Sequence, residues 1–213
     1  MYFNRPPGCP DLRHAVDKFL TRRLFIAITP PQVILDSLGE FQLQLQSLNL
    51  PVDWEPREKL HITLNFLGRV ADDDFTPVIR NLAAFARSRT GLSLTPMFLE
   101  TLYQRHDNSL IYIGFSGDLK QLRQMQKSLS LSLSQLSFPQ PRRFLPHLTI
   151  GRLKRTDPTT TKKYMDLIRT REFIPLPAFT VDSLALYQSF LSRAGSHYQR
   201  LRTFTLGDSP STL

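Results

Sequence analysis

Cysteine is nearly absent from this sequence of 213 residues, and glycine is scarce. The single Cys9 cannot form an internal disulfide or contribute to a thiolate zinc cluster, which indicates an intracellular protein. Nine glycines exclude a collagen-like repeat. Hydrophobic residues at 41% and charged residues at 21% exclude a disordered chain, so we expect a globular protein with a substantial core.

Long hydrophobic runs are also missing. The longest apolar stretches, such as residues 24–28, are far shorter than the ~20 residues that a membrane-spanning helix needs. The first 20 residues contain no apolar stretch of the kind that marks a secretion signal. The sequence therefore predicts a cytoplasmic protein with no membrane partner.

Acidic residues are in the minority, because 27 Lys and Arg against 18 Asp and Glu give a formal charge of +9. This excess favours a polyanion such as nucleic acid as a partner, although charge alone is a weak signal. The length fits one domain or two small lobes. We expect an N-terminal extension at 1–22 with a short helix at 11–20, a main domain at 23–206, and a C-terminal tail at 207–213.

The main domain opens with a strand, a helix and a second strand. Residues 24–29 (LFIAIT) form an apolar run stopped by two prolines, as expected for a buried strand. Apolar residues between 34 and 48 recur at steps of three and four, which predicts a helix that packs back on this strand. A polar loop at 51–59 holds the only tryptophan, and residues 60–67 (LHITLNFL) predict another strand.

The same order recurs further along the chain. Residues 110–115 and 147–153 have the pattern of strands, and apolar spacing between 122 and 136 predicts a helix. The remaining expected elements are helices near 74–87 and 160–170 and strands near 92–103, 179–188 and 197–206.

A shift of 86 residues places His61 on His147 and Thr63 on Thr149, which indicates a diverged internal duplication. The chain has no glycine-rich fingerprint of a parallel dinucleotide-binding fold. We therefore expect an α+β fold of two pseudo-symmetric lobes, with mainly antiparallel sheets, helices on the outer faces and a central cleft.

His61 and His147 begin two versions of one tetrapeptide, His-Ile-Thr-Leu and His-Leu-Thr-Ile. In a strand, residues i and i+2 point to the same face, so each histidine shares its face with the threonine two residues later. Chance repetition of this pattern among five histidines is on the order of one in several hundred. We therefore expect His61, Thr63, His147 and Thr149 to meet across one cleft.

Two imidazoles can divide proton transfer between them, one neutral as a base and one protonated as an acid. The hydroxyls of Thr63 and Thr149 could donate hydrogen bonds to the non-bridging oxygens of a phosphoryl group. This combination favours phosphoester cleavage without a metal. A metal site is the alternative use of two histidines, but neither motif strand carries an Asp or Glu to complete it. We predict no metal and no cofactor.

These motifs and their surroundings resemble the 2H phosphoesterase superfamily, in particular its bacterial RNA 2′,3′-cyclic phosphodiesterases, also called 2′-5′ RNA ligases. The stretches that carry the resemblance lie between residues 23 and 206: RLFIAI followed by two prolines, KLHITLNFLG, PHLTIGR, LYQS and GSHY. The resemblance implies a bilobal α+β fold and a metal-free reaction. It also implies hydrolysis of RNA 2′,3′-cyclic phosphate ends to a 2′-phosphate, with a weak reverse activity that joins 2′-5′ ends.

The resemblance assigns roles to five residues. His61 matches the general acid, the proton donor to the departing 3′ oxygen, and His147 matches the general base, the proton acceptor from water. Thr63 and Thr149 match the phosphate-binding positions. Arg152 matches the arginine that closes the second motif and contacts the phosphate. The residues alone permit either assignment of acid and base, because the pair is pseudo-symmetric.

Other features of the sequence have two interpretations. Three phenylalanines, Phe25, Phe66 and Phe144, could stack an RNA base, although apolar neighbours favour the core for Phe25 and Phe66. Four cations flank the second motif and could either guide RNA or form a solvated face: Arg142, Arg143, Lys154 and Arg155. We expect a monomer whose partner is RNA with 2′,3′-cyclic phosphate termini or related nucleotides. The alternative to an enzyme is a non-catalytic RNA- or nucleotide-binding module that keeps the cleft.

Overall fold

The structure, a computed structural model, describes residues 21–141, 143–192 and 195–207. The helix predicted at 11–20, Cys9 and Arg142 lie outside the described residues. The first strand begins at Thr21, two residues before the expected start of the main domain. The division of the chain into an extension, a main domain and a tail stays a prediction.

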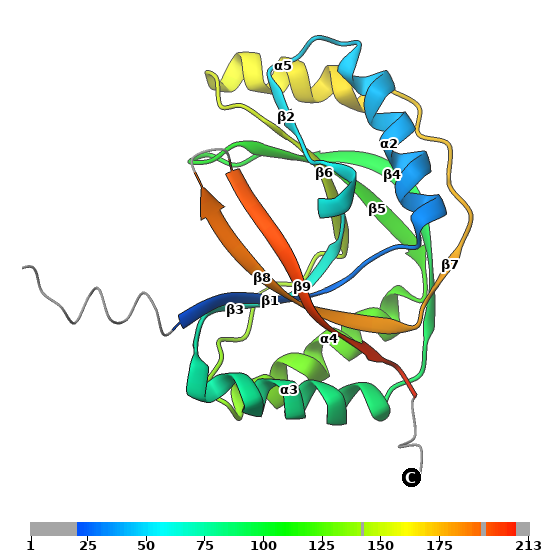
Figure 1. Ribbon diagram of the computed structural model, residues 1–213. Coiled ribbons are helices and arrows are strands. Elements are labelled where there is room, and N and C mark those ends of the chain that lie inside the picture. Colours follow the sequence, from blue (N-terminus) through cyan, green and yellow to red (C-terminus); the bar gives the residue numbers. More distant parts are fainter. Residues whose placement is uncertain (1–20, 142, 193–194, 208–213) are drawn as a thin grey trace, which may run out of the picture.

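Strands and helices alternate irregularly along the described chain (Figure 1). Their bounds are β1 Thr21–Ile28, α2 Gln32–Gln46, β2 Val52–Trp54, the 3-10 helix η1 Arg57–Lys59, β3 Ile62–Ala71, α3 Asp72–Arg87, β4 Leu92–Leu102, β5 Ser109–Gly117, α4 Leu119–Ser134, β6 His147–Leu153, α5 Pro158–Arg169, β7 Phe179–Val181, β8 Ser183–Ser192 and β9 Gly195–Thr205.

The strands form two antiparallel sheets with matching strand orders. Sheet A has the order β3-β1-β8-β9, and sheet B has the order β2-β6-β5-β4-β7. The two orders agree when β3 is equated with β6, β1 with β5, β8 with β4, and β9 with β7, which leaves β2 as an additional edge strand. This arrangement confirms the expected α+β fold with two pseudo-symmetric lobes.

In each half of the repeat, the helix contacts the sheet that does not contain the strand before it. Helix α2 follows β1 of sheet A, yet its Gln42 donates a hydrogen bond to Ile150 of β6 in sheet B. Helix α4 follows β5 of sheet B, yet its Gln126 donates to Leu64 of β3 in sheet A. In Figure 1, α2 and α5 lie at the top of the molecule and α3 and α4 at the bottom. The expectation that the first helix packs back on residues 24–29 is therefore wrong, because two prolines end β1 and the helix that follows them bonds to the other sheet.

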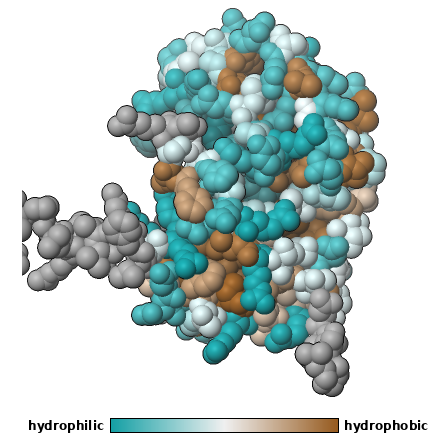
Figure 2. Space-filling view, viewed as in Figure 1, coloured by the Kyte–Doolittle hydropathy of each residue, from teal (hydrophilic) through white to brown (hydrophobic). Residues whose placement is uncertain are grey.

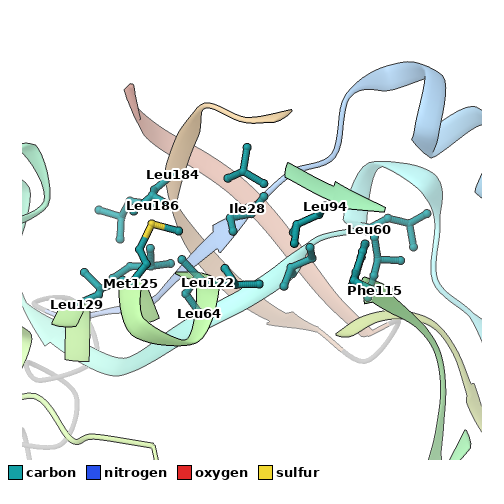
Figure 3. Close-up of a cluster of buried hydrophobic side chains, with 14 of the residues drawn as sticks. Ile28, Leu60, Leu64, Leu94, Phe115, Leu122, Met125, Leu129, Leu184 and Leu186 are labelled. Atoms are coloured by element: carbon teal, nitrogen blue, oxygen red, sulfur yellow. The ribbon is translucent and has the colours of Figure 1, made fainter. Parts of the chain in front are cut away.

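One hydrophobic core joins both sheets. Side chains from β1, β8, α4, β4 and β5 meet in the part of it drawn in Figure 3, among them Ile28, Leu184, Leu129, Leu94 and Phe115. Burying a large apolar side chain contributes about 1.5–3 kcal/mol, so this shared core holds the two lobes in one arrangement.

Two local expectations differ from the structure. The predicted loop at 51–59 contains β2, whose Trp54 pairs with Gly151 of β6. The strand predicted at 179–188 is two strands separated at Asp182, because β7 pairs with β4 in sheet B and β8 pairs with β1 in sheet A. Strands of three residues are too short to show an alternating pattern, and their partners are distant in the sequence.

On the face in Figure 2, apolar residues form separate patches within a largely hydrophilic surface. Within the described ranges, every helix is too short or too polar to cross a lipid bilayer.

We predict that Gly117→Ala destabilises the protein more than Gly68→Ala. Both glycines have a positive φ, +95° and +72°, which strains any other residue by about 1 kcal/mol. A Cβ atom at Gly117 would also lie 2.5 Å from the backbone oxygen of Ser93, whereas nothing lies within 4 Å at Gly68. This contact adds about 1–3 kcal/mol of strain. Urea unfolding of the two variants measures the difference, and equal losses would contradict the prediction.

Candidate active site

The two motifs occupy equivalent positions in the two sheets. His61 directly precedes β3, and His147 is the first residue of β6. In both tetrapeptides the histidine and threonine are half-buried while the intervening and following apolar residues are buried. The predicted alternation is therefore present: the apolar side chains enter the core, and each histidine shares the opposite face with its threonine.

Both imidazoles are held in the same way by the backbone two residues upstream. Nδ1 of His61 lies 2.5 Å from the carbonyl oxygen of Lys59, and Nδ1 of His147 lies 2.7 Å from that of Leu145. A carbonyl oxygen only accepts hydrogen bonds, so Nδ1 carries the proton in each ring. Nε2 is therefore the atom of each ring that is left for proton transfer.

A single pocket of about 690 Å³ brings together all five residues predicted for the site. His61 and Thr63 come from sheet A, and His147, Thr149 and Arg152 come from sheet B. The pocket thus lies between the two lobes, where the central cleft was expected.

Aromatic rings surround His61. The rings of Phe25, Tyr187 and Tyr198 lie 5.0, 6.2 and 5.5 Å from its imidazole, measured between centroids. Nε2 of His61 lies 3.0 Å from the hydroxyl oxygen of Thr63. In the neutral ring this nitrogen accepts the threonine proton, and in the protonated ring it donates.

Burial lowers the pKa of His61 below its ordinary value, because the charged imidazolium loses hydration in this aromatic surrounding. The hydrogen bond to the Lys59 carbonyl and the negative charge of Glu55 act in the opposite direction. The nearby imidazole of His147 and the guanidinium of Arg152 lower the pKa of His61 further. The free protein therefore favours the neutral form of His61 near pH 7.

Glu55 is a site residue that the sequence did not reveal. Its carboxylate accepts a hydrogen bond of 2.9 Å from Nε of Arg152, and it lines the same pocket. Among the described residues this bond engages only Nε, which leaves both terminal nitrogens of the guanidinium free to bind an anion. Glu55 lies 97 residues from Arg152 in a segment without a recognisable motif, so no local signal indicated the pair.

The phenylalanines divide between core and cleft. Phe25 is buried, as expected, but in the aromatic group around His61 rather than in the main core. Phe66 is 68% exposed at the edge of the pocket, so the core prediction for it is wrong. The bulge that lets Phe66 pair with Phe25 skips Leu67, which takes the buried position instead. Phe144 lines an adjoining pocket with Arg143.

The two cations after the second motif, Lys154 and Arg155, do not line the pocket that holds the histidines. Lys154 forms an ion pair of 3.0 Å with Asp53, and Arg155 lines a separate pocket. Besides Arg152, the cations that line the site are Arg23 and Lys59. The cations around this pocket are therefore partly different from those named in the sequence, and a role for any of them in guiding RNA stays a prediction.

No three His, Cys, Asp or Glu side chains gather closely enough for a metal ion in the part of the chain that the structure describes. The absence of a metal from the reaction stays a prediction.

The sequence matches the profile of the 2′-5′ RNA ligase superfamily over residues 22–189. This match covers most of the chain, and the chain belongs to that superfamily. The resemblance to 2H phosphoesterases is thereby confirmed, and the protein is an enzyme of the phosphodiesterase class.

Curated relatives and solved structures agree with this membership. An RNA 2′,3′-cyclic phosphodiesterase of Methanocaldococcus jannaschii is 29% identical over 180 residues, covering 84% of this chain and 98% of the relative. A protein of the same name from Thermotoga maritima is 26% identical over 179 residues, covering 84% and 92%. The structure of Escherichia coli LigT complexed with 3′-AMP shares the fold, with a TM-score of 0.70, 20% identity, and coverage of 88% and 99%.

We predict that Glu55→Gln lowers the pKa of His61 further. The neutral amide removes the negative charge that favours the imidazolium, while the burial that opposes the charge remains. An NMR titration of the His61 imidazole measures the change. Glu40→Gln removes an exposed carboxylate from α2 and serves as the control. An unchanged or raised pKa in Glu55→Gln would contradict this role for Glu55.

Proposed function

We propose that this protein hydrolyses 2′,3′-cyclic phosphate at RNA ends to a 2′-phosphate without a metal. The observation that carries the proposal is the pair of histidines in one pocket, each with Nδ1 bonded to the backbone and a threonine two residues later. The relatives named RNA 2′,3′-cyclic phosphodiesterase support the same substrate.

The cyclic phosphate binds through three side chains in this proposal. Thr63 and Thr149 donate hydrogen bonds to the two non-bridging oxygens, one from each lobe. Arg152 places its terminal nitrogens on the same oxygens while Glu55 holds its Nε. Donors fixed before the reaction stabilise the charge that builds on the phosphoryl oxygens in the transition state.

The two histidines move the protons. Nε2 of His147 accepts a proton from water as the water oxygen bonds to phosphorus. The bond between phosphorus and the 3′ oxygen breaks, and that oxygen takes the proton from Nε2 of His61. One water is consumed, and the resting protonation states return by exchange of a proton with the solvent.

The burial of His61 links its protonation to substrate binding. The phosphodiester carries a negative charge, and an opposite charge within ~4–6 Å favours the imidazolium. The bound substrate thus raises the pKa of His61, which must act as the acid. This effect opposes the desolvation that lowers the same pKa in the free protein.

The proposal includes a weak joining activity. When a 5′-hydroxyl of RNA takes the place of water, the same proton transfers connect the cyclic end to that strand through a 2′-5′ linkage. The name of the superfamily supports this second use of the site.

The first test is hydrolysis of a short RNA that ends in 2′,3′-cyclic phosphate, with EDTA present. We expect turnover to a 2′-phosphate, a loss of ~10²–10⁴ in rate for His61→Ala or His147→Ala, and little further loss in the double variant, because the two groups act as one unit. His197→Ala changes an exposed histidine outside the pocket and serves as the control.

Loss of turnover on adding EDTA would contradict the metal-free mechanism. An inactive parent protein that still binds the RNA would favour the alternative, a non-catalytic RNA- or nucleotide-binding module.

The pH dependence should show the link between His61 and the substrate. Because the acid must be protonated and the base neutral, both kcat/KM and kcat should follow bell-shaped profiles between pH 5 and 9. Because burial lowers the pKa of His61 in the free protein and bound phosphate raises it, the limb of the profile that reports His61 should lie at lower pH for kcat/KM than for kcat. A flat profile, or identical profiles for kcat/KM and kcat, would contradict the assignment.

A further inference from the structure

Each H-x-T-x strand contains a β-bulge immediately after its threonine. In the β1–β3 pair, Ala27 faces Thr63 and Ile26 faces Asn65, so Leu64 is the extra residue. In the β5–β6 pair, Tyr112 faces Thr149 and Ile111 faces Gly151, which makes Ile150 the extra residue. Leu64 and Ile150 correspond under the shift of 86 residues. A bulge changes the direction of the neighbouring side chains and is typical of strands beside active sites.

A buried glutamine reaches each bulge from a helix. Nε2 of Gln42 donates to the carbonyl oxygen of Ile150 at 2.7 Å, and Nε2 of Gln126 donates to that of Leu64 at 3.3 Å. Both glutamines are only 5% exposed. Burying an amide is unfavourable unless it is hydrogen-bonded. A buried glutamine amide at each of the two equivalent bulges therefore requires an explanation beyond core packing.

Each glutamine also forms hydrogen bonds beyond its bulge. Gln42 also donates to the carbonyl oxygen of Glu55 at 2.8 Å, and the backbone N–H of Glu55 donates to the same Ile150 oxygen at 3.0 Å. This joins the bulge of β6 to the residue whose carboxylate holds Arg152.

On the other side, Gln126 donates to the hydroxyl of Ser130 at 2.9 Å, and Asn65 donates to the same hydroxyl at 2.8 Å. All three side chains of this network are buried. The network therefore fixes the residue that follows Leu64 in β3 as well as Leu64 itself.

We propose that Gln42 and Gln126 are paired positioning residues, each of which fixes the bulge that aims the threonine of one H-x-T-x motif. Each is supplied by the helix that follows a strand of the other sheet, so the two lobes position each other's phosphate-binding groups. The proposal rests on the proposed function in one respect, namely that Thr63 and Thr149 bind the reacting phosphate.

The two positioning residues act on different sets of groups. Gln42 controls Thr149 and, through Glu55, Arg152, so its loss should weaken substrate binding as well as turnover. Gln126 controls Thr63, whose hydroxyl also contacts Nε2 of His61, so its loss should act mainly on kcat. We expect each strand to stay paired on both sides of its bulge when the carbonyl loses the glutamine donor, which separates this role from a general loss of folding.

The test is a set of double-variant cycles with RNA ending in 2′,3′-cyclic phosphate. Methionine has the length of glutamine without its donor, so we use Gln42→Met and Gln126→Met together with Thr63→Val and Thr149→Val. A misplacement of 1 Å can cost ~10² in rate, and a lost transition-state donor costs ~10²–10³.

We expect the matched pairs, Gln42 with Thr149 and Gln126 with Thr63, to lose little more than the larger single variant. The mismatched pairs should lose close to the product of the two single effects. Gln42→Met should also raise KM, unlike Gln126→Met. Equal coupling in matched and mismatched pairs would overturn the proposal.

A control separates positioning from stability. Thr161 of α5 is 3% exposed and hydrogen-bonded to Thr156 outside the site, so Thr161→Val removes a comparable buried bond. It should lower the melting temperature without changing kcat, whereas each glutamine variant should lower kcat at temperatures where it is folded. If a methionine variant does not fold, asparagine at the same position keeps the amide but cannot reach the carbonyl.

NMR distinguishes a failure of this proposal from a failure of the proposed function. Gln42→Met should shift the methyl signal of Thr149 and leave that of Thr63 in place, and Gln126→Met should do the reverse, whether or not the parent protein turns over RNA. Normal turnover of the parent with additive cycles and no selective shift would overturn the positioning role alone. If the two variants show these selective shifts but the parent protein does not turn over RNA, the positioning role stands and the proposed enzymatic function is rejected.

Discussion

The site depends on the alternation of buried and cleft-facing side chains in β3 and at the start of β6. Ile62 and Leu148 enter the apolar core, and this burial forces the neighbouring histidine and threonine of each motif to the opposite face. Turning a strand over would place an imidazole in the core and an aliphatic side chain in the pocket. The free energy of core burial therefore also orients the reactive groups, and the same constraint operates once in each lobe.

The exchange of helices between sheets makes the two lobes interdependent. Helix α2 leaves sheet A and covers sheet B, while α4 leaves sheet B and contacts sheet A, so neither lobe is a continuous segment of the chain. A cleft between two separately folded lobes could open and alter the spacing of its histidines. Here the shared core and the crossed helices resist such a movement. The proposed binding of a phosphate between Thr63 and Thr149 needs this constancy.

The pseudo-symmetry of the backbone does not extend to electrostatics. His61 is enclosed by Phe25, Tyr187 and Tyr198, whereas the described aromatic contact of His147 is with Tyr112. The enclosure disfavours the charge on His61 in the free protein. A duplicated motif can in this way give two histidines in different surroundings, as the proposed acid and base catalysis requires.

Sequence alone determined most of the element types, the two H-x-T-x motifs, the face shared by each histidine and threonine, and the family, because these depend on local periodicity and a short pattern of residues. Tertiary structure decided what depends on distant partners: the pairing of β2 with β6, the division of 179–188 between two sheets, the exposure of Phe66, and the contact of Glu55 with Arg152. Gln42 and Gln126 show the same limit. The apolar spacing of a helix indicates which of its faces is buried. Only the packing of α2 on sheet B and of α4 on sheet A places the two amides on the two bulges.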